Sequence, residues 1–220
     1  VMLVDPPVFR VNRFTSITKL PSSAVLALNA HLLWRGHEVR VMDCRNQNLF
    51  YADIEREVAE FEPEVVGITG YSSDAYSAMI ACESVKSACP SALTVMGGYH
   101  ASAVPELTLL TCDALDVVVV GEGERTLDDL LELLASTGGW APENLAGIAG
   151  IVFRSGPDCA TRTGARSLVE QLDELAPGRY DNISTEYYQY PAQSRSASGA
   201  NGFLFSASRG CTHACHYCSN

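Results

Sequence analysis

The chain has 220 residues, of which 47% are hydrophobic and 19% charged, so it can bury the core of a full domain. Fifteen basic against 26 acidic side chains give a net charge of −11. This argues against a nucleic-acid surface, where clustered lysine and arginine neutralise phosphates. No stretch approaches about 18 consecutive apolar residues, so we expect no membrane span. The opening VMLVDPP has no features of a secretion signal, and we expect a cytoplasmic protein.

Short apolar runs alternate with amphipathic stretches in the first part of the chain. The expected strands are almost continuously apolar and cover residues 1–5, 38–43, 64–70, 92–98 and 114–121. The expected helices between them cover residues 24–36, 52–61, 75–89 and 124–136, with Ser22 or Ser23 and Asp74 as N-caps. This alternation predicts a doubly wound, Rossmann- or flavodoxin-like α/β domain with a five-stranded parallel sheet, over residues 1–140.

The rest of the chain has a different character. Residues 147–156 and 159–164 form an expected hairpin that turns at Gly156 and Pro157. Residues 168–201 are polar, aromatic and glycine-rich without clean periodicity, which is typical of a linker that wraps a surface. We assign residues 141–202 to the hairpin and interdomain linker, and residues 203–220 to the start of a second domain.

Ligands of parallel α/β sheets bind at the carboxyl ends of the strands. The loops there carry Gly70, Gly97, Gly98, Gly121 and Gly123, which let a flat or bulky ligand approach the backbone. Each loop alone could be an ordinary strand-to-helix turn, but four on one edge predict a ligand cleft.

The sequence disfavours a dinucleotide or nucleoside triphosphate as this ligand. The first loop, DPPVFR, has no glycine, and neither a dinucleotide fingerprint after the first strand nor a P-loop motif occurs. Glu122 and Glu124 would repel a pyrophosphate. Alternatively, these two carboxylates are simply stabilised by a helix N-terminus.

Three of the eight cysteines, Cys211, Cys215 and Cys218, lie within eight residues in a C-x3-C-x2-C pattern. Such spacing suits a [4Fe–4S] cluster that leaves one iron open for a small-molecule ligand. The alternative is zinc, held by two or three of the cysteines with His213 or His216. The pattern favours the cluster. The remaining cysteines are scattered, and we expect them to be reduced thiols.

The cysteine pattern, with Tyr217 before its last cysteine and FLFSASRG ahead of it, resembles the opening of a radical S-adenosylmethionine (SAM) domain. The preceding α/β domain, with GGYHASAVPE and GEGE at its strand ends, resembles the cobalamin-binding domain of B12-dependent radical SAM enzymes. The resemblance covers essentially the whole chain. It implies that residues 203–220 are the truncated start of a radical SAM (β/α) barrel.

The resemblance implies three cofactors. Cys211, Cys215 and Cys218 would hold the [4Fe–4S] cluster, whose open iron binds SAM, with Tyr217 near the adenine. Reductive cleavage of SAM would give a 5′-deoxyadenosyl radical, and methylcobalamin would supply a methyl group for an unactivated carbon. The residues implied to surround cobalamin follow three strands and are Gly70, Tyr71, Ser72, Ser73, Gly97, Gly98, Tyr99, His100, Gly121, Glu122, Gly123 and Glu124.

One feature departs from many cobalamin domains, which place D-x-H-x-x-G after the first strand so that the histidine ligates cobalt. Here that loop begins Asp5-Pro6-Pro7, so we expect base-off cobalamin without a protein histidine on cobalt, and His100 as part of the pocket wall.

The resemblance also implies a small-molecule or peptide substrate and an electron donor such as flavodoxin or ferredoxin. A barrel needs roughly 200 further residues, so the 220 residues alone are expected to bind cobalamin without catalysing. Two alternatives stay open: a non-catalytic cobalamin-binding or sensing module with a structural metal, and a radical SAM enzyme whose α/β domain no longer binds B12.

Overall fold

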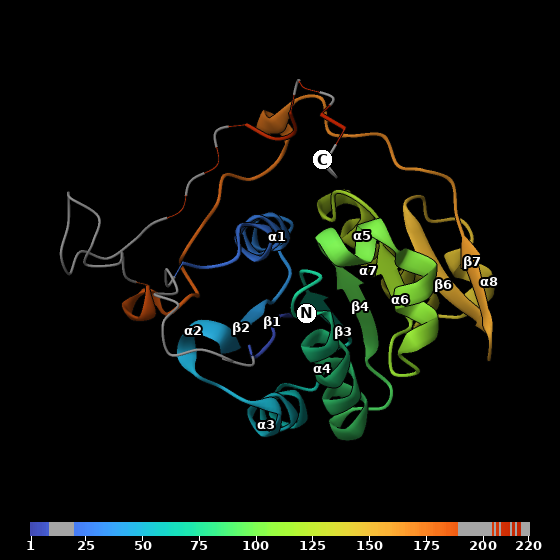
Figure 1. Cartoon of the computed structure of the whole chain (residues 1–220), viewed down its shortest axis with the longest axis horizontal. Helices are drawn as coiled ribbons and strands as arrows, with labels where there is room; N and C mark the ends of the chain where they lie inside the picture. The colour runs from blue at the N-terminus through green and yellow to red at the C-terminus, as the bar shows by residue number, and fades with distance from the viewer. Residues whose placement is uncertain are drawn as a thin grey trace.

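The computed structural model describes residues 1–8, 20–188, 204, 206, 208–211, 213, 215 and 216. Its centre is a seven-stranded sheet in the order β2-β1-β3-β4-β5-β6-β7 (Figure 1). In chain order the strands are β1 (Met2–Asp5), β2 (Arg40–Asp43), β3 (Val65–Thr69), β4 (Leu93–Gly97), β5 (Val117–Val119), β6 (Ile151–Gly156) and β7 (Cys159–Arg162).

The first five strands are all parallel, which confirms the expected doubly wound α/β fold. Leu3 lies opposite Val41 on one side and Gly67 on the other, and Val95 lies between Gly67 and Val117. The expected hairpin also forms, as β6 and β7. It extends the same sheet, because β6 pairs antiparallel with β5 and covers what would have been an open edge.

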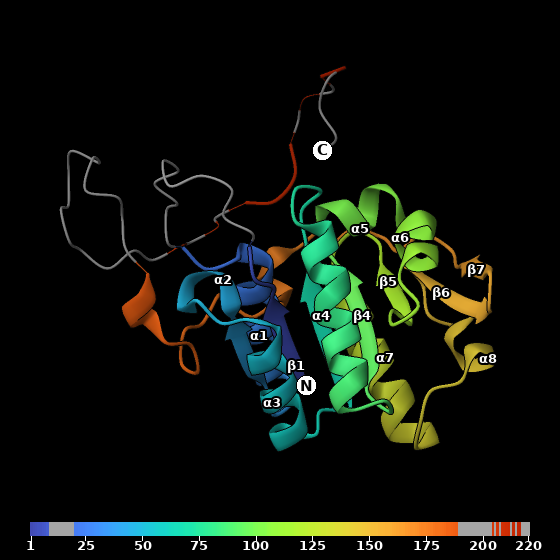
Figure 2. The same cartoon turned by 60° about the horizontal axis from the view of Figure 1, so that its bottom comes forward.

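Helices cover both faces of the sheet (Figures 1 and 2). They are α1 (Ser23–Trp34), α2 (Cys44–Gln47), α3 (Tyr51–Phe61), α4 (Ala75–Ala88), α5 (Tyr99–Ala103), α6 (Pro105–Thr111), α7 (Glu124–Thr137) and α8 (Pro142–Leu145). Side chains of α3, α4 and α6 pack on one face, and those of α1, α7 and α8 pack on the other. None of the helices in the described residues is long and apolar enough to cross a membrane.

Alternation along the strands divides the core in two. Met2 and Val4 of β1 belong to the cluster under α3 and α4, whereas Leu3 between them belongs to the cluster under α1 and α7. Successive residues of a strand point to opposite faces of the sheet. Because helices cover both faces, the residues on either face are apolar, and each strand is an almost continuous apolar run.

The N-caps and helix starts agree only partly with those expected from the sequence. Ser22 caps α1 as expected, its hydroxyl accepting from the amide of Val25 at 3.5 Å. Asp74 occupies the N-cap position of α4 but makes no side-chain cap; its carboxylate accepts instead from the amide of Tyr71 at 2.7 Å. The stretch after β4, expected as a loop, contains α5 and α6, and Pro105 starts α6 at a position where its missing N–H costs nothing.

The segment from Val169 to Tyr188 returns across the domain beside α1 and β2 (Figure 1). Asn182 and Asn29 exchange two side-chain hydrogen bonds of 2.7 and 3.0 Å, and Asn182 also donates to the carbonyl of Val39 at 2.9 Å. Tyr188 is almost fully buried. This segment is therefore packed on the sheet domain.

A charged cluster lies at the carboxyl end of β1. Arg45 of α2 donates to Asp74 at 2.5 Å and to Asp5 at 3.4 Å. The Asp43 carboxyl is close enough to raise the pKa of both Arg45 and Asp5. All three carboxyl groups are buried. Burial is the main reason why the pKa of Asp5 rises from 3.8 to about 7, with Asp43 and Asp74 raising it further and Arg45 opposing them.

Asp5→Asn tests this cluster through the pH dependence of stability. The folded state holds the Asp5 proton more tightly than the unfolded state, so the free energy of unfolding falls as pH rises from 3.8 towards about 7. We expect the substitution to stabilise the protein more at pH 8 than at pH 5, the difference being on the order of 2 kcal/mol. Urea unfolding at both pH values measures it.

The matched control is Asp158→Asn, in the exposed turn between β6 and β7. It should leave the pH dependence unchanged. If Asp5→Asn also leaves it unchanged, the cluster does not raise the pKa of Asp5 as described.

Candidate functional site

The carboxyl ends of β1, β3, β4 and β5 meet at one edge of the sheet, because these strands are neighbours and parallel. This brings together the loops that begin at Gly70, Gly98 and Gly121, beside the end of β1 at Asp5 (Figure 2). Strand order reverses between β1 and β3, where β1 has β2 on its other side, and such a switch point is where open α/β sheets bind ligands.

The loops after β3 and β4 are joined to each other by several contacts. His100 Nδ1 lies 3.2 Å from Ser72 Oγ, and the amide of His100 donates to the carbonyl of Gly70 at 3.4 Å. The rings of Tyr71 and Tyr99 stack with centroids 5.6 Å apart. Both tyrosines are exposed, so they present an aromatic surface to solvent at the rim of this edge.

The part of the Tyr71 side chain that is covered by protein, followed by the nearby Asp5 carboxyl, raises the pKa of Tyr71 above its ordinary value. The phenol therefore stays protonated at neutral pH and can donate a hydrogen bond. The neighbouring hydroxyls of Ser72 and Ser73 are exposed as well. This loop offers neutral polar groups, which suit a ligand with amide or hydroxyl substituents.

Gly98 is required where the two loops approach most closely. Its φ is +98°, and a Cβ at this position would lie 3.0 Å from both the Gly70 carbonyl oxygen and Thr69 Oγ1. Any side chain here would be strained and would push the loops after β3 and β4 apart.

Gly97 and Gly121 differ from Gly98, because their backbones face open space. A Cβ on Gly97 would meet only Val119, at 4.0 Å, and a Cβ on Gly121 would meet nothing within 4 Å. The amide of Gly121 donates to Ser102 Oγ of α5 at 3.0 Å, which joins the loop after β5 to that after β4. Uncovered backbone at both positions lets a ligand approach the edge closely.

Glu122 and Glu124 make their contacts within the protein. Arg209 donates to Glu124 Oε1 at 2.5 Å and to Glu122 Oε1 at 3.5 Å. The other oxygen of Glu122 accepts from the amide of Val169 at 2.8 Å. Gly123, between them, packs on Leu28 of α1, whose Cδ2 would lie 3.2 Å from an added Cβ. Glu122 and Glu124 remain predicted cobalamin-loop residues, but both carboxylates already contact Arg209.

The cysteine segment is described only in part. Cys211 and Cys215 are exposed free thiols, and the amide of His213 donates to Cys211 Sγ at 3.5 Å. Cys218 and Tyr217 lie outside the described residues. Within the described ranges no three side chains converge as metal ligands, so the three-cysteine site stays a prediction from the sequence.

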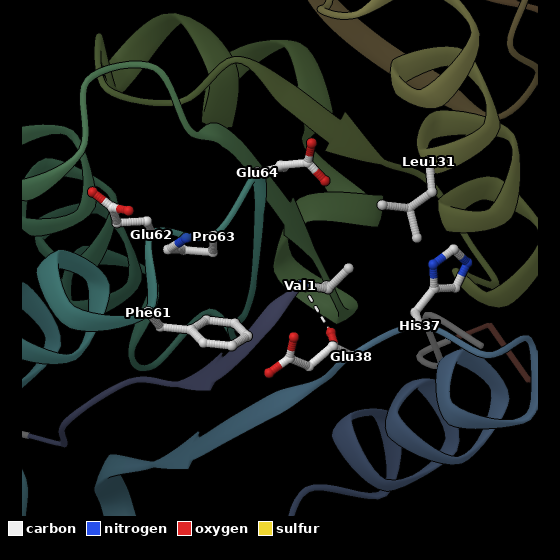
Figure 3. A pocket seen from close by; sticks show the side chains of 8 residues that line it. All are labelled: Val1, His37, Glu38, Phe61, Glu62, Pro63, Glu64 and Leu131. Atoms are coloured by element: carbon white, nitrogen blue, oxygen red, sulfur yellow. Dashed lines mark hydrogen bonds between the residues drawn. The ribbon is translucent and has the colours of Figure 1, made fainter.

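A cavity of about 290 Å³ lies at the opposite, amino edge of the sheet (Figure 3). Its lining residues are Val1, His37, Glu38, Phe61, Glu62, Pro63, Glu64 and Leu131. The amino group of Val1 donates to the Glu38 carbonyl at 2.9 Å across it. None of the residues expected from the sequence to contact a ligand lines this cavity.

Sequence reasoning missed two parts of the site. Arg45 is held by the short helix α2, for which the sequence has no periodic signal. Arg209 pairs with carboxylates more than 80 residues away. A lone arginine just before the cysteines and an acid pair just after a strand were the only signals for that contact.

Comparison with known proteins bears on this edge. The family model described as B12 binding domain matches residues 10–131, more than half of the chain. An uncharacterized methyltransferase of Pyrococcus horikoshii is 30% identical over 100% of this chain and 45% of its own length. The hopanoid C-3 methylase of Methylococcus capsulatus is 30% identical over 84% of this chain and 33% of its own length.

An anaerobic magnesium-protoporphyrin IX monomethyl ester cyclase of Rubrivivax gelatinosus is 24% identical over 90% of this chain and 35% of its own length. The chain thus spans less than half the length of each of these relatives.

A solved structure of similar fold is that of the cobalamin-dependent S-adenosylmethionine radical enzyme OxsB with aqua-cobalamin and S-adenosylmethionine bound. It has a TM-score of 0.58 and 16% identity, over 76% of this chain and 22% of that one. The apo form of OxsB gives a TM-score of 0.59. These two structures show a similar fold. The family match, which includes β2 to β5 and the loops of the carboxyl edge, shows that the chain belongs to the B12-binding domain family.

Proposed function

We propose that this chain is the cobalamin-binding portion of a cytoplasmic B12-dependent radical SAM enzyme that transfers a methyl group to an unactivated carbon. The observation that carries the proposal is the arrangement of the carboxyl edge, where three glycine-bearing loops lie beside the switch point. Arg209, two positions before Cys211, binds Glu124 at the end of the last of these loops. Family membership and the methyltransferases among its relatives support it.

The residues at this edge fit a corrin. A corrin is wide and flat and is fringed with amides, so it needs open backbone and neutral polar groups. Gly97 and Gly121 supply the open backbone, and Ser72, Ser73 and Tyr71 supply hydroxyls. Residues 70–73, 97–100 and the backbone of 121–124 are therefore the proposed cobalamin contacts.

Cobalamin supplies a cobalt-borne methyl group, and a [4Fe–4S] cluster with SAM and an electron from a flavodoxin or ferredoxin supplies the radical that activates the substrate carbon. Cys211, Cys215 and Cys218 would hold the cluster. The chain's own contribution would be to bind and orient: the loops would hold the corrin at the edge, and Tyr71 and Tyr99, which stack on each other, would pack beside it.

Gly97→Ala tests the cobalamin assignment. The free protein has room for the added methyl group, so the free energy of unfolding should stay within about 0.5 kcal/mol of wild type. A ligand that lies against this backbone would lose contact, and we expect the Kd for hydroxocobalamin to rise about tenfold. Equilibrium dialysis with absorbance detection measures it.

Gly139→Ala is the matched control, because a Cβ there meets nothing within 4 Å, so the added methyl group is accommodated as it is at Gly97, and the residue is far from the edge. Equal cobalamin affinity in the wild type and both variants would place the ligand elsewhere. A folded wild-type protein that retains no cobalamin would contradict the proposed function.

His100→Ala tests cobalt ligation. His100 is the only histidine among the described residues of the loops after β3, β4 and β5, and its Nδ1 already contacts Ser72 Oγ. We expect bound cobalamin to show a base-off absorption spectrum in both the wild type and this variant. Nitrogen ligation that disappears in His100→Ala would make this residue the lower ligand of cobalt.

Replacing the cysteines of the motif one at a time by alanine tests the cluster in the full-length protein. After anaerobic reconstitution we expect about four iron atoms per wild-type chain, and loss of the cluster absorbance when Cys211, Cys215 or Cys218 is changed. Cys159→Ala, at another exposed thiol, is the control. Bound zinc that is lost in His213→Ala would favour the alternative metal.

A further inference from the structure

The loop after β5 and the first turn of α7 contact the later part of the chain at three points. Glu122 accepts from the amide of Val169, Arg125 forms an ion pair with Glu174, and Glu122 and Glu124 both bind Arg209. Two of these contacts are made to the first residues of the returning segment, and the third is made just before the cysteines. Together they hold the later part of the chain against the sheet domain.

Glu124 is the most buried member of this group. It is the first residue of α7 and only 4% exposed. Its Oε1 lies 2.5 Å from a guanidinium nitrogen of Arg209. Without Arg209 the buried Glu124 carboxylate would lose its counter-charge, so breaking this contact would be strongly destabilising.

A second contact holds the same segment five residues earlier. The hydroxyl of Tyr180 donates to the carbonyl of Leu204 at 2.9 Å, and the amide of Leu204 donates back to that hydroxyl at 2.7 Å. Leu204 also packs beside Leu26, Ile183 and Tyr188. The chain is therefore anchored at residues 204 and 209, and Gly210, with φ +75°, turns it directly before Cys211.

We propose that Arg209 is a positioning residue: its contact with Glu122 and Glu124 holds Cys211, the first cysteine of the motif, near the carboxyl edge, and so helps to set the separation between cluster and cobalt. This inference rests on the proposed function. In this arrangement the side chains of Glu122 and Glu124 bind Arg209, while the backbone of the same segment stays available to the corrin. The two glutamates thereby connect the proposed cluster site with the proposed cobalamin site.

The first test needs no cofactor. Hydrogen–deuterium exchange is measured on the full-length protein for peptides that cover residues 204–211. We expect Arg209→Gln and Glu124→Gln each to speed exchange there about tenfold, and the double variant to be no faster than the faster single one. Arg209→Lys should recover part of the protection. Arg162→Gln, which breaks the exposed pair with Glu106, is the matched control and should change nothing in these peptides.

The second test reads the positions of the cofactors. Pulsed electron paramagnetic resonance gives the distance distribution between cob(II)alamin and the reduced cluster in loaded protein. We expect a narrow distribution in wild type and Arg162→Gln, a broadened one in Arg209→Gln, and partial narrowing in Arg209→Lys. A merely structural role would alter stability without changing this distribution.

The outcomes separate the two proposals. Unchanged exchange at residues 204–211, or faster exchange with an unchanged cobalt–cluster distribution, overturns the role of Arg209 while cobalamin and cluster still load. A folded wild type that loads neither cofactor overturns the proposed function, and with it the positioning role.

Discussion

The parallel adjacency of β1, β3, β4 and β5 is the constraint on which the candidate site depends. Each of these strands ends at the same edge, so loops that are far apart in sequence become neighbours. The contact between Gly98 and Gly70 then sets how closely two of them approach. The aromatic stack, the open glycine backbone and the arginine contact all follow from loops held at this spacing.

The fold was predictable because its signals are local. Buried parallel strands are apolar on both faces, and Ser22, Pro63 and Gly138 mark helix boundaries within a few residues of where they occur. The placement of the hairpin was not predictable, since Ile151 and its neighbours would suit a separate ribbon as well as the free edge of β5. Nor were α5 and α6, which are too short for periodicity to reveal.

For the site, the sequence predicted which loops would meet but not what their side chains would contact. Ser72 and His100 were expected at one edge and do lie together. Glu122 and Glu124 were expected beside a ligand, yet their partner is Arg209, an ion pair that depends on the path of the returning chain. Asp74 likewise looked like a cap, and only the position of Arg45 shows why its carboxylate turns away from the helix.

The pairing of Asn29 with Asn182 also has a consequence for the order of folding. These residues are 153 positions apart, and Asn182 binds the carbonyl of Val39 just before β2. The surface that receives Asn182 exists only after α1 and β2 have packed on the sheet. Docking of the returning segment therefore requires these two elements to be in place, and its detachment would break none of the hydrogen bonds between strands.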